Sequence, residues 1–243
     1  MLRAMNAIDY LQVIRDESAA LAEAASRVPL ETPVPTCPGW TMGQLVTHLG
    51  QVQRWCNFIV STRAQERPDR SAFPQAPQAD LVPWFREATS TLLDTLSKAD
   101  PATPLWTWTP ERKAGYWRRR QAQEAAVHRW DAQNAAGAAQ PLEAALAADG
   151  IDELLEMLPF VPGSRTGSGE TVHLHCTDVS GEWLVRLGTK GLEVGRKHAK
   201  GDAAVRGKAS DLDLFLWGRI PATALEVFGD AALVARFQGL TAL

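Results

Sequence analysis

The sequence has few cysteines, almost no net charge and no long apolar run. The three cysteines among 243 residues are Cys37, Cys56 and Cys176, and none belongs to a Cys-x-x-Cys pair. This odd and scattered set predicts reduced thiols in a reducing compartment rather than a disulfide framework. Lys and Arg number 25 against 28 Asp and Glu, for a formal net charge of −3. The chain therefore lacks the basic field of most nucleic-acid-binding proteins.

No apolar stretch approaches the roughly 20 residues that a membrane-spanning helix needs. With 45% hydrophobic and 22% charged residues, the composition is that of a globular chain and excludes extensive disorder. We expect a cytoplasmic protein with neither nucleic-acid nor membrane partners, acting on small molecules as a monomer or small homo-oligomer.

Apolar residues in the first half recur with helical spacing and predict four amphipathic helices. Proline-rich segments separate them. Asn6 or Asp9 is the expected cap of the first, Thr41 and Gln44 have the spacing of a capping box for the second, and Asp80 is the expected cap of the third. The expected ranges are 8–28, 42–63, 81–96 and 117–136, the last ending at Gly137. Four such helices predict an antiparallel bundle, which we assign to residues 1–140.

From Pro141 the pattern changes to one helix followed by short strands and turns. The expected helix ends near Pro159, and Ser210 or Asp211 is the expected cap of a later helix. A last helix follows Gly229 and Asp230. The expected strands are 171–176, 183–187, 192–194 and, more weakly, 203–206. Residues 141–243 thus predict a small α+β domain, and the whole chain an α+β fold.

Three side chains of the bundle have the residue types of a metal site. Glu124 and His128 lie one turn apart on the fourth helix and therefore point in similar directions. His48 lies among apolar residues of the second helix, where a polar ring needs a partner. Two imidazoles and one carboxylate form the three-ligand set of a catalytic zinc site with an open fourth position. On spacing alone, however, a surface pair or a satisfied core pair is the commoner explanation.

Three motifs, in this order and at these intervals, resemble the mycothiol-dependent maleylpyruvate isomerase family. They are the segments Pro38-Gly39-Trp40-Thr41, His48-Leu49-Gly50 and Glu124-Ala125-Ala126-Val127-His128-Arg129-Trp130-Asp131. The likeness continues through residues 205–212 and 216–219 and so spans nearly the whole chain. The resemblance implies a DinB-like metal-binding four-helix bundle followed by a small C-terminal α/β domain similar to sterol carrier proteins.

The resemblance also implies roles for individual residues. His48, Glu124 and His128 match the family's zinc ligands, and Arg219 matches an arginine that faces the metal pocket and holds an anionic substrate. Arg219 could instead pair with Asp211 or Asp213 at the surface. In the family's reaction, mycothiol adds to a C=C bond, rotation follows, and elimination of the thiol returns the trans isomer. We therefore expect Zn²⁺ or another divalent metal such as nickel or iron, with mycothiol as thiol cosubstrate.

Several other residues have a functional and a structural explanation. Asp131 could orient a metal ligand, although a solvated helix position is the favoured interpretation. Cys37, before a helix start, could be a reactive thiol, but a turn cysteine that packs on Trp40 is favoured. Arg118, Arg119 and Arg120 could attract an anionic ligand, but a solvated helix start is the favoured interpretation.

A second pair of histidines lies in the first expected strand. His173 and His175 alternate with apolar residues and therefore project from one strand face. A metal site there would need a third ligand, and the sequence does not indicate one.

Three functions remain open at this stage. A site of this kind could isomerise its substrate by reversible thiol addition, or it could transfer the thiol permanently as a detoxifying or biosynthetic S-transferase. A non-catalytic protein, in which the metal only stabilises the bundle and the second domain binds an apolar ligand, is the third. A structural zinc has four protein ligands and a catalytic one has an open position. Three good ligands favour an enzyme.

Overall fold

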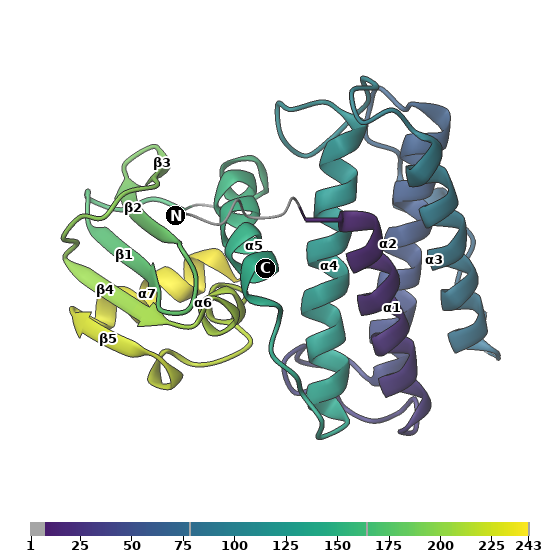
Figure 1. Cartoon of the computed structure of the whole chain (residues 1–243), viewed down its shortest axis with the longest axis horizontal. Coiled ribbons are helices and arrows are strands. Elements are labelled where there is room, and N and C mark those ends of the chain that lie inside the picture. Colours follow the sequence, from purple (N-terminus) through teal and green to yellow (C-terminus); the bar gives the residue numbers. More distant parts are fainter. Residues whose placement is uncertain (1–7, 78, 164, 243) are drawn as a thin grey trace, which may run out of the picture. The chain divides into compact units, whose positions relative to one another are not determined.

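The computed structural model describes residues 8–77, 79–163 and 165–242 and separates the chain into two compact units, Met1–Gln140 and Pro141–Leu243. The first unit is helical and the second holds a mixed sheet with helices (Figure 1). The predicted α+β fold class is confirmed. Within the described residues, no helix is long and apolar enough to cross a membrane.

The N-terminal unit is a bundle of four long helices. They are α1 (Tyr10–Ser26), α2 (Met42–Thr62), α3 (Leu81–Lys98) and α4 (Ala114–Ala135), with a short 3₁₀ helix η1 (Arg70–Ala72) between α2 and α3. α1 packs against α4 and α3, and α2 packs against α3 and α4. The fourth helix begins at Ala114 rather than near Trp117, so the arginines at 118–120 lie inside it.

Side chains cap the starts of α1 and α2, whereas α3 and α4 begin without a side-chain capping hydrogen bond. Asp9 accepts hydrogen bonds from the backbone of Leu11 and Gln12, and Thr41 and Gln44 form the predicted capping box. Asn6, the alternative cap, lies outside the described residues. Asp80 occupies the N-cap position of α3, but its side chain makes no capping hydrogen bond there. That part of the prediction was wrong, because Asp80 has a left-handed backbone with φ of 55° rather than the extended geometry of a capping residue.

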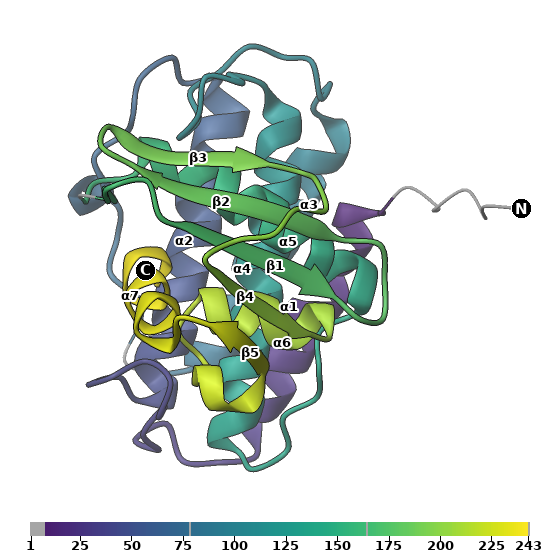
Figure 2. The ribbon, with the colours of Figure 1, turned by 90° about the vertical axis from the view of Figure 1, so that its left-hand side faces the viewer.

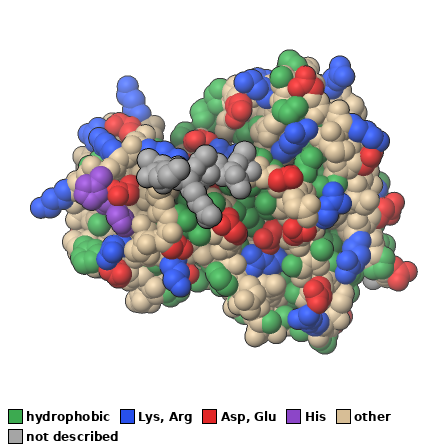
Figure 3. Space-filling model, viewed as in Figure 1, with side chains coloured by type: hydrophobic (Ala, Val, Ile, Leu, Met, Phe, Trp, Pro, Cys, Tyr) green, Lys and Arg blue, Asp and Glu red, His purple; other side chains and the backbone are tan. Residues whose placement is uncertain are grey.

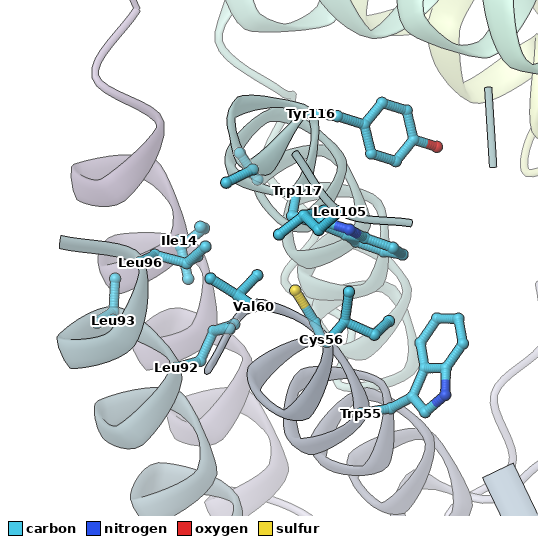
Figure 4. Close-up of a cluster of buried hydrophobic side chains, with 13 residues drawn as sticks. Ile14, Trp55, Cys56, Val60, Leu92, Leu93, Leu96, Leu105, Tyr116 and Trp117 are labelled. Atoms are coloured by element: carbon cyan, nitrogen blue, oxygen red, sulfur yellow. The ribbon is translucent and has the colours of Figure 1, made fainter. Parts of the chain in front are cut away.

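Two hydrophobic clusters fill the bundle at different levels. One contains Trp55, Cys56, Leu92 and Trp117 (Figure 4), and the other contains Leu21, Leu45, Leu49 and Phe85. On α2, the buried amide of Gln53 lies between Leu49 of one cluster and Trp55 of the other. It donates to Ser18 Oγ at 3.0 Å and accepts from Thr89 Oγ1 at 2.7 Å. The buried polar groups of this level are therefore satisfied across three helices.

The C-terminal unit has a five-stranded sheet with helices against it. Its elements are α5 (Ala144–Met157), η2 (Leu158–Phe160), β1 (Thr171–Cys176), β2 (Glu182–Gly188), β3 (Gly191–Gly195), β4 (Ala203–Gly207), α6 (Ala209–Leu216), η3 (Ala222–Ala224), β5 (Glu226–Gly229) and α7 (Ala231–Thr241). The strand order is β3-β2-β1-β4-β5 (Figure 2), with β1 and β4 parallel and the other pairs antiparallel. The four predicted strands are present.

β5 was not predicted, and its residues are largely exposed, so apolar alternation is weak there. The last helix, α7, follows Gly229 and Asp230 as expected, and Asp230 caps it. The prediction that Ser210 or Asp211 caps α6 was wrong, because α6 begins after Lys208. The Ser210 hydroxyl instead accepts a hydrogen bond from the Leu142 backbone at 2.9 Å.

The two faces of the sheet differ in composition. Val172 and Leu174 of β1 and Val205 of β4 are fully buried, and α6 and α7 pack against these two strands. The alternate positions of β1 hold His173 and His175 and therefore project from the opposite face. Side chains alternate between the two faces of a strand, so burial of Val172 and Leu174 against the helices places the two histidines on the other face.

The capping box of α2 gives a direct test of local stabilisation. Thr41→Ala removes the hydroxyl that accepts from the Gln44 backbone, and the free energy of unfolding should fall by about 1 kcal/mol. Urea denaturation measures this change, with Thr41→Ser, which retains the hydroxyl, as the control. Equal midpoints for the alanine variant and the wild type would contradict a stabilising box.

Candidate metal centre

His48, Glu124 and His128 meet inside the N-terminal unit. His48 Nε2, from α2, lies 3.1 Å from Glu124 Oε1, and His128 Nε2 lies 3.5 Å from the same oxygen. One ligand atom from each side chain lies within 4.8 Å of the others. The sequence placed these three residues on two helices with suitable spacing, and the structure brings them together. The side chains of His48 and Glu124 are 29% and 18% exposed, so the site is accessible on one side.

The carboxylate of Glu124 is held in its charged form. Its second oxygen accepts a hydrogen bond from Arg120 at 2.8 Å, one turn earlier on α4. Burial by itself would raise the pKa of Glu124, but hydrogen bonds from His128 and His48 and the charge of Arg120 outweigh it. The pKa therefore lies well below its usual value, and the group is an anion at neutral pH.

His128 is placed between two carboxylates, one at each ring nitrogen. Its Nδ1 lies 2.9 Å from Asp131 Oδ2, and because an ionised carboxylate can only accept, Nδ1 is the donor. Burial would lower the pKa of His128, but hydrogen bonds with Asp131, Cys37 and Glu124 outweigh it and raise the pKa well above its usual value. The ring of His128 thus has Nδ1 at Asp131 and Nε2 facing Glu124.

The segment before α2 contacts Asp131, the residue that bonds to His128. Thr36 Oγ1 donates to Asp131 Oδ1 at 2.6 Å, and Cys37 Sγ lies 3.4 Å from Asp131 Oδ2. The turn is closed by hydrogen bonds from Val34 N to Trp40 O and from Trp40 N to Cys37 O. Gly39 has φ of +83°, which favours glycine and explains this residue in the motif.

Trp40 covers the two imidazoles. Its ring centroid lies 4.8 Å from that of His48 and 6.3 Å from that of His128, the latter nearly stacked. An indole beside the histidines limits the rotamers available to both rings and removes water from part of the site. Gly50, in the second motif, is explained by close packing: a Cβ at this position would lie 2.3 Å from the ring of Trp84.

Several expectations for this region were wrong. Asp131 is not a solvated helix residue, because it is fully buried and contacts His128, Thr36 and Cys37. Cys37 is buried in the turn, but its thiol contacts the Asp131 carboxylate, which sequence reasoning missed. Arg120 is 5% exposed and pairs with Glu124 instead of being solvated at a helix start. The i, i+4 spacing of Arg120 and Glu124 was a visible signal for this pair.

Arg219 lies in the C-terminal unit, directly after the turn that ends α6. Gly218 has φ of +74°, and the Arg219 backbone donates to Leu214 O, which closes this turn. The Arg219 guanidinium donates to Trp217 O at 2.6 Å and lies 5.9 Å from the centre of the Trp217 ring. Its expected contact with an anionic substrate stays a prediction.

Comparisons with known proteins agree with the motifs. The profile described as the mycothiol maleylpyruvate isomerase N-terminal domain matches residues 11–133, and that of the MDMPI C-terminal domain matches residues 145–236. The chain belongs to the mycothiol maleylpyruvate isomerase family. Its membership in this family confirms the expectation of an enzyme. No sequence among the curated proteins matches the chain.

Two solved structures share the fold over most of the chain. One is the mycothiol-dependent maleylpyruvate isomerase, with 14% identity and a TM-score of 0.60, and the other is a histidine-to-alanine mutant of that isomerase, with 13% identity and a TM-score of 0.63. In both cases the match covers 90% of this chain and 91% of the other. At such low identity the likeness concerns the fold.

Two of the protein's three thiols, Cys56 and Cys176, are poorly suited to act as nucleophiles, and alkylation tests this. Burial raises the pKa of Cys56 well above its usual value. Burial, together with the nearby charge of Asp178, raises the pKa of Cys176 to about 12. Because the thiolate is the reactive form, we expect iodoacetamide at pH 8 to leave both residues unmodified in the native chain. Peptide mass spectrometry measures this, with the urea-unfolded chain as the control. Rapid native labelling at either cysteine would contradict the burial.

Proposed function

We propose that this protein is a zinc-dependent enzyme that activates a low-molecular-weight thiol, mycothiol, for addition to an electrophilic substrate. The proposed reaction resembles the cis–trans isomerisation of maleylpyruvate. The convergence of His48 Nε2, His128 Nε2 and the Glu124 carboxylate on one point carries this proposal. The matches to both domains of the isomerase family support it.

The donor set fits a zinc ion. Two imidazole nitrogens and one ionised carboxylate are ligands that Zn²⁺ prefers, and three protein ligands leave a fourth position open. A second group, Cys37, Asp131 and His128, also has three potential ligands, but all three are buried. The first group is partly exposed and therefore accessible to a thiol, which favours it as the metal centre. In this proposal Asp131 orients His128 and does not bind the metal itself.

Each side chain around the proposed ligands has a definite task. Asp131 holds Nδ1 of His128, so that Nε2 is the nitrogen presented to the metal. Arg120 balances the charge of Glu124 and fixes its second oxygen. Trp40 restricts the two imidazoles. These contacts preorganise the ligands before a metal binds, which lowers the cost of ordering them.

The reacting thiol is proposed to come from the cosubstrate, because Cys37, Cys56 and Cys176 are all buried. A bound zinc ion would supply Lewis acidity that favours the thiolate over the thiol at neutral pH. In the isomerisation, the thiolate sulfur forms a bond to one alkene carbon while the π bond breaks and its electron pair moves onto the conjugated carbonyl. The resulting C–C single bond rotates, and return of the electron pair re-forms the alkene and breaks the C–S bond, which releases the thiolate. Arg219 is proposed to hold a carboxylate of the substrate.

Thiol consumption distinguishes the isomerase from an S-transferase. Isomerisation returns the thiol, so free thiol measured with a chromogenic disulfide should stay constant while the substrate turns over. Transfer consumes one thiol per product and would replace the isomerase assignment. A non-catalytic metal-stabilised protein that binds an apolar ligand predicts no turnover of maleyl-type electrophiles with any thiol.

Removal of one ligand tests the metal centre. His128→Ala should lower the zinc content by one equivalent per chain and should abolish thiol-dependent turnover, because two remaining ligands hold zinc weakly. Elemental analysis and an activity assay on the same samples measure both effects. Lys98→Ala, at an exposed position of α3, is the matched control. Unchanged turnover in a variant that has lost its metal would separate the metal from the reaction.

Asp131→Asn tests the orienting role without removing a proposed ligand. The amide cannot replace the charged acceptor at His128 Nδ1, and zinc affinity should fall by about 10- to 100-fold. Competition with a zinc indicator measures the affinity, and circular dichroism shows whether the helices persist. An affinity equal to that of the wild type in a folded variant would exclude the orienting role.

Arg219→Gln tests the anion-binding proposal. It should raise KM for a dicarboxylate electrophile much more than for an uncharged maleyl-type analogue, because only the former loses an ion pair. Steady-state kinetics with both substrates measure the difference. Equal effects on the two KM values would assign Arg219 a structural role.

A further inference from the structure

A second cluster of histidines lies in the C-terminal unit. The sequence contains five histidines, and His48 and His128 belong to the proposed metal centre. The other three, His173, His175 and His198, surround the carboxylate of Glu182. All five histidines thus lie in two groups, each with at least one carboxylate. In Figure 3, histidine side chains gather beside an acidic side chain on the molecular surface.

Sheet geometry accounts for three members of this cluster. His173 and His175 are two residues apart on β1 and therefore project from the same face. Glu182 opens β2 and is the direct antiparallel partner of His175. Side chains at directly opposed positions have Cβ atoms about 5 Å apart. The fourth member, His198, comes from the segment between β3 and β4, and only the tertiary fold brings it to this face.

The potential ligand atoms already face one another. His173 Nε2 and His198 Nδ1 lie 3.2 and 2.6 Å from Glu182 Oε2, and His175 Nδ1 lies 3.2 Å from Glu182 Oε1. The ring centroids of the three histidines are 5.4 to 6.4 Å apart, with interplanar angles of 68° to 89°. One ligand atom from each of the four residues lies within 4.8 Å of the others.

This donor set has a defined metal preference. Three imidazoles and one carboxylate are nitrogen and oxygen ligands suited to Zn²⁺, whose structural sites are tetrahedral with four protein ligands. Four atoms around a tetrahedral zinc with bonds of about 2.0–2.2 Å lie roughly 3.4 Å apart. The ligand atoms of the cluster lie within 4.8 Å of one another, so the wider separations must shorten slightly, and His198 Nδ1 must move away from its 2.6 Å contact with Glu182. His198 is 80% exposed as a side chain, and His175 and Glu182 are about one-third exposed, so such small rotations are possible.

We propose that His173, His175, Glu182 and His198 form a second zinc site, of the closed structural type. The ion would link β1 and β2 to the segment between β3 and β4, on the face of the sheet opposite α6 and α7. The site belongs entirely to the C-terminal unit and uses no residue of the bundle. It is therefore independent of the proposed enzymatic function, and either can fail without the other.

Zinc stoichiometry in four forms of the full, untagged chain tests the proposal. The forms are the wild type, His48→Gln/His128→Gln, His175→Ala/His198→Ala and the combination of all four substitutions. After chelation, dialysis against micromolar free zinc and elemental analysis should give two, one, one and no equivalents per chain. The quadruple variant keeps no proposed site intact, so it reports nonspecific zinc.

The result that would overturn the proposal is equal zinc content in the wild type and His175→Ala/His198→Ala. A loss confined to His48→Gln/His128→Gln would leave only the bundle site. Conversely, a loss confined to the sheet variant would support the second site and contradict the first. Lys197→Ala, which removes an exposed charge next to His198 without removing a ligand, should retain two equivalents.

Thermal unfolding provides a readout that does not depend on activity. Zinc that binds the folded sheet raises the midpoint of unfolding, because it binds the native state more tightly than the unfolded chain. In the His48→Gln/His128→Gln background the midpoint should rise with added zinc, and Glu182→Gln should reduce the rise. A midpoint that zinc does not change in this background would contradict a structural site.

Discussion

The charged carboxylate of Glu124 organises the middle of the bundle. It is held against two imidazoles and a guanidinium in a place where an unpaired charge would be strongly unfavourable. Each partner comes with its own constraint: Arg120 lies one turn earlier on α4, His128 one turn later, and His48 on a different helix. The position of α2 against α4 is thereby tied to the geometry of a single anion. Hydrophobic packing brings the helices together, but this cluster favours one alignment of the polar residues.

The turn before α2 joins the same network from outside the helices. Thr36 and Cys37 contact Asp131, and Trp40 covers the two imidazoles, so a proline-rich segment of no regular structure becomes part of the site. Its glycine has the positive φ that the turn needs, and its threonine begins the next helix. Neighbouring residues of one short motif thus provide both the cap of α2 and the contacts that support His128.

The two histidine clusters use different secondary structures to bring similar potential ligands together. In the bundle, the i, i+4 spacing on α4 supplies two groups and a neighbouring helix supplies the third. In the sheet, the i, i+2 spacing on β1 supplies two groups, and a directly opposed position on β2 supplies the next. The first cluster has three potential ligands and an accessible side, whereas the second has four. This difference is the one expected between a site for chemistry and a site for stability.

The sequence by itself determined the four helices, most of their ends, four strands and the α+β class, because these depend on local periodicity, capping residues and prolines. It also singled out His48, Glu124 and His128, which the structure brings together; their role as metal ligands stays a prediction. Tertiary structure decided the rest: Asp131 is buried because Thr36 and Cys37, about 95 residues earlier in the chain, are folded onto it. His198 joins the histidines of β1 only through strand pairing. Such contacts join residues far apart in the chain, and a periodic pattern contains no information about which distant segment will cover a given face.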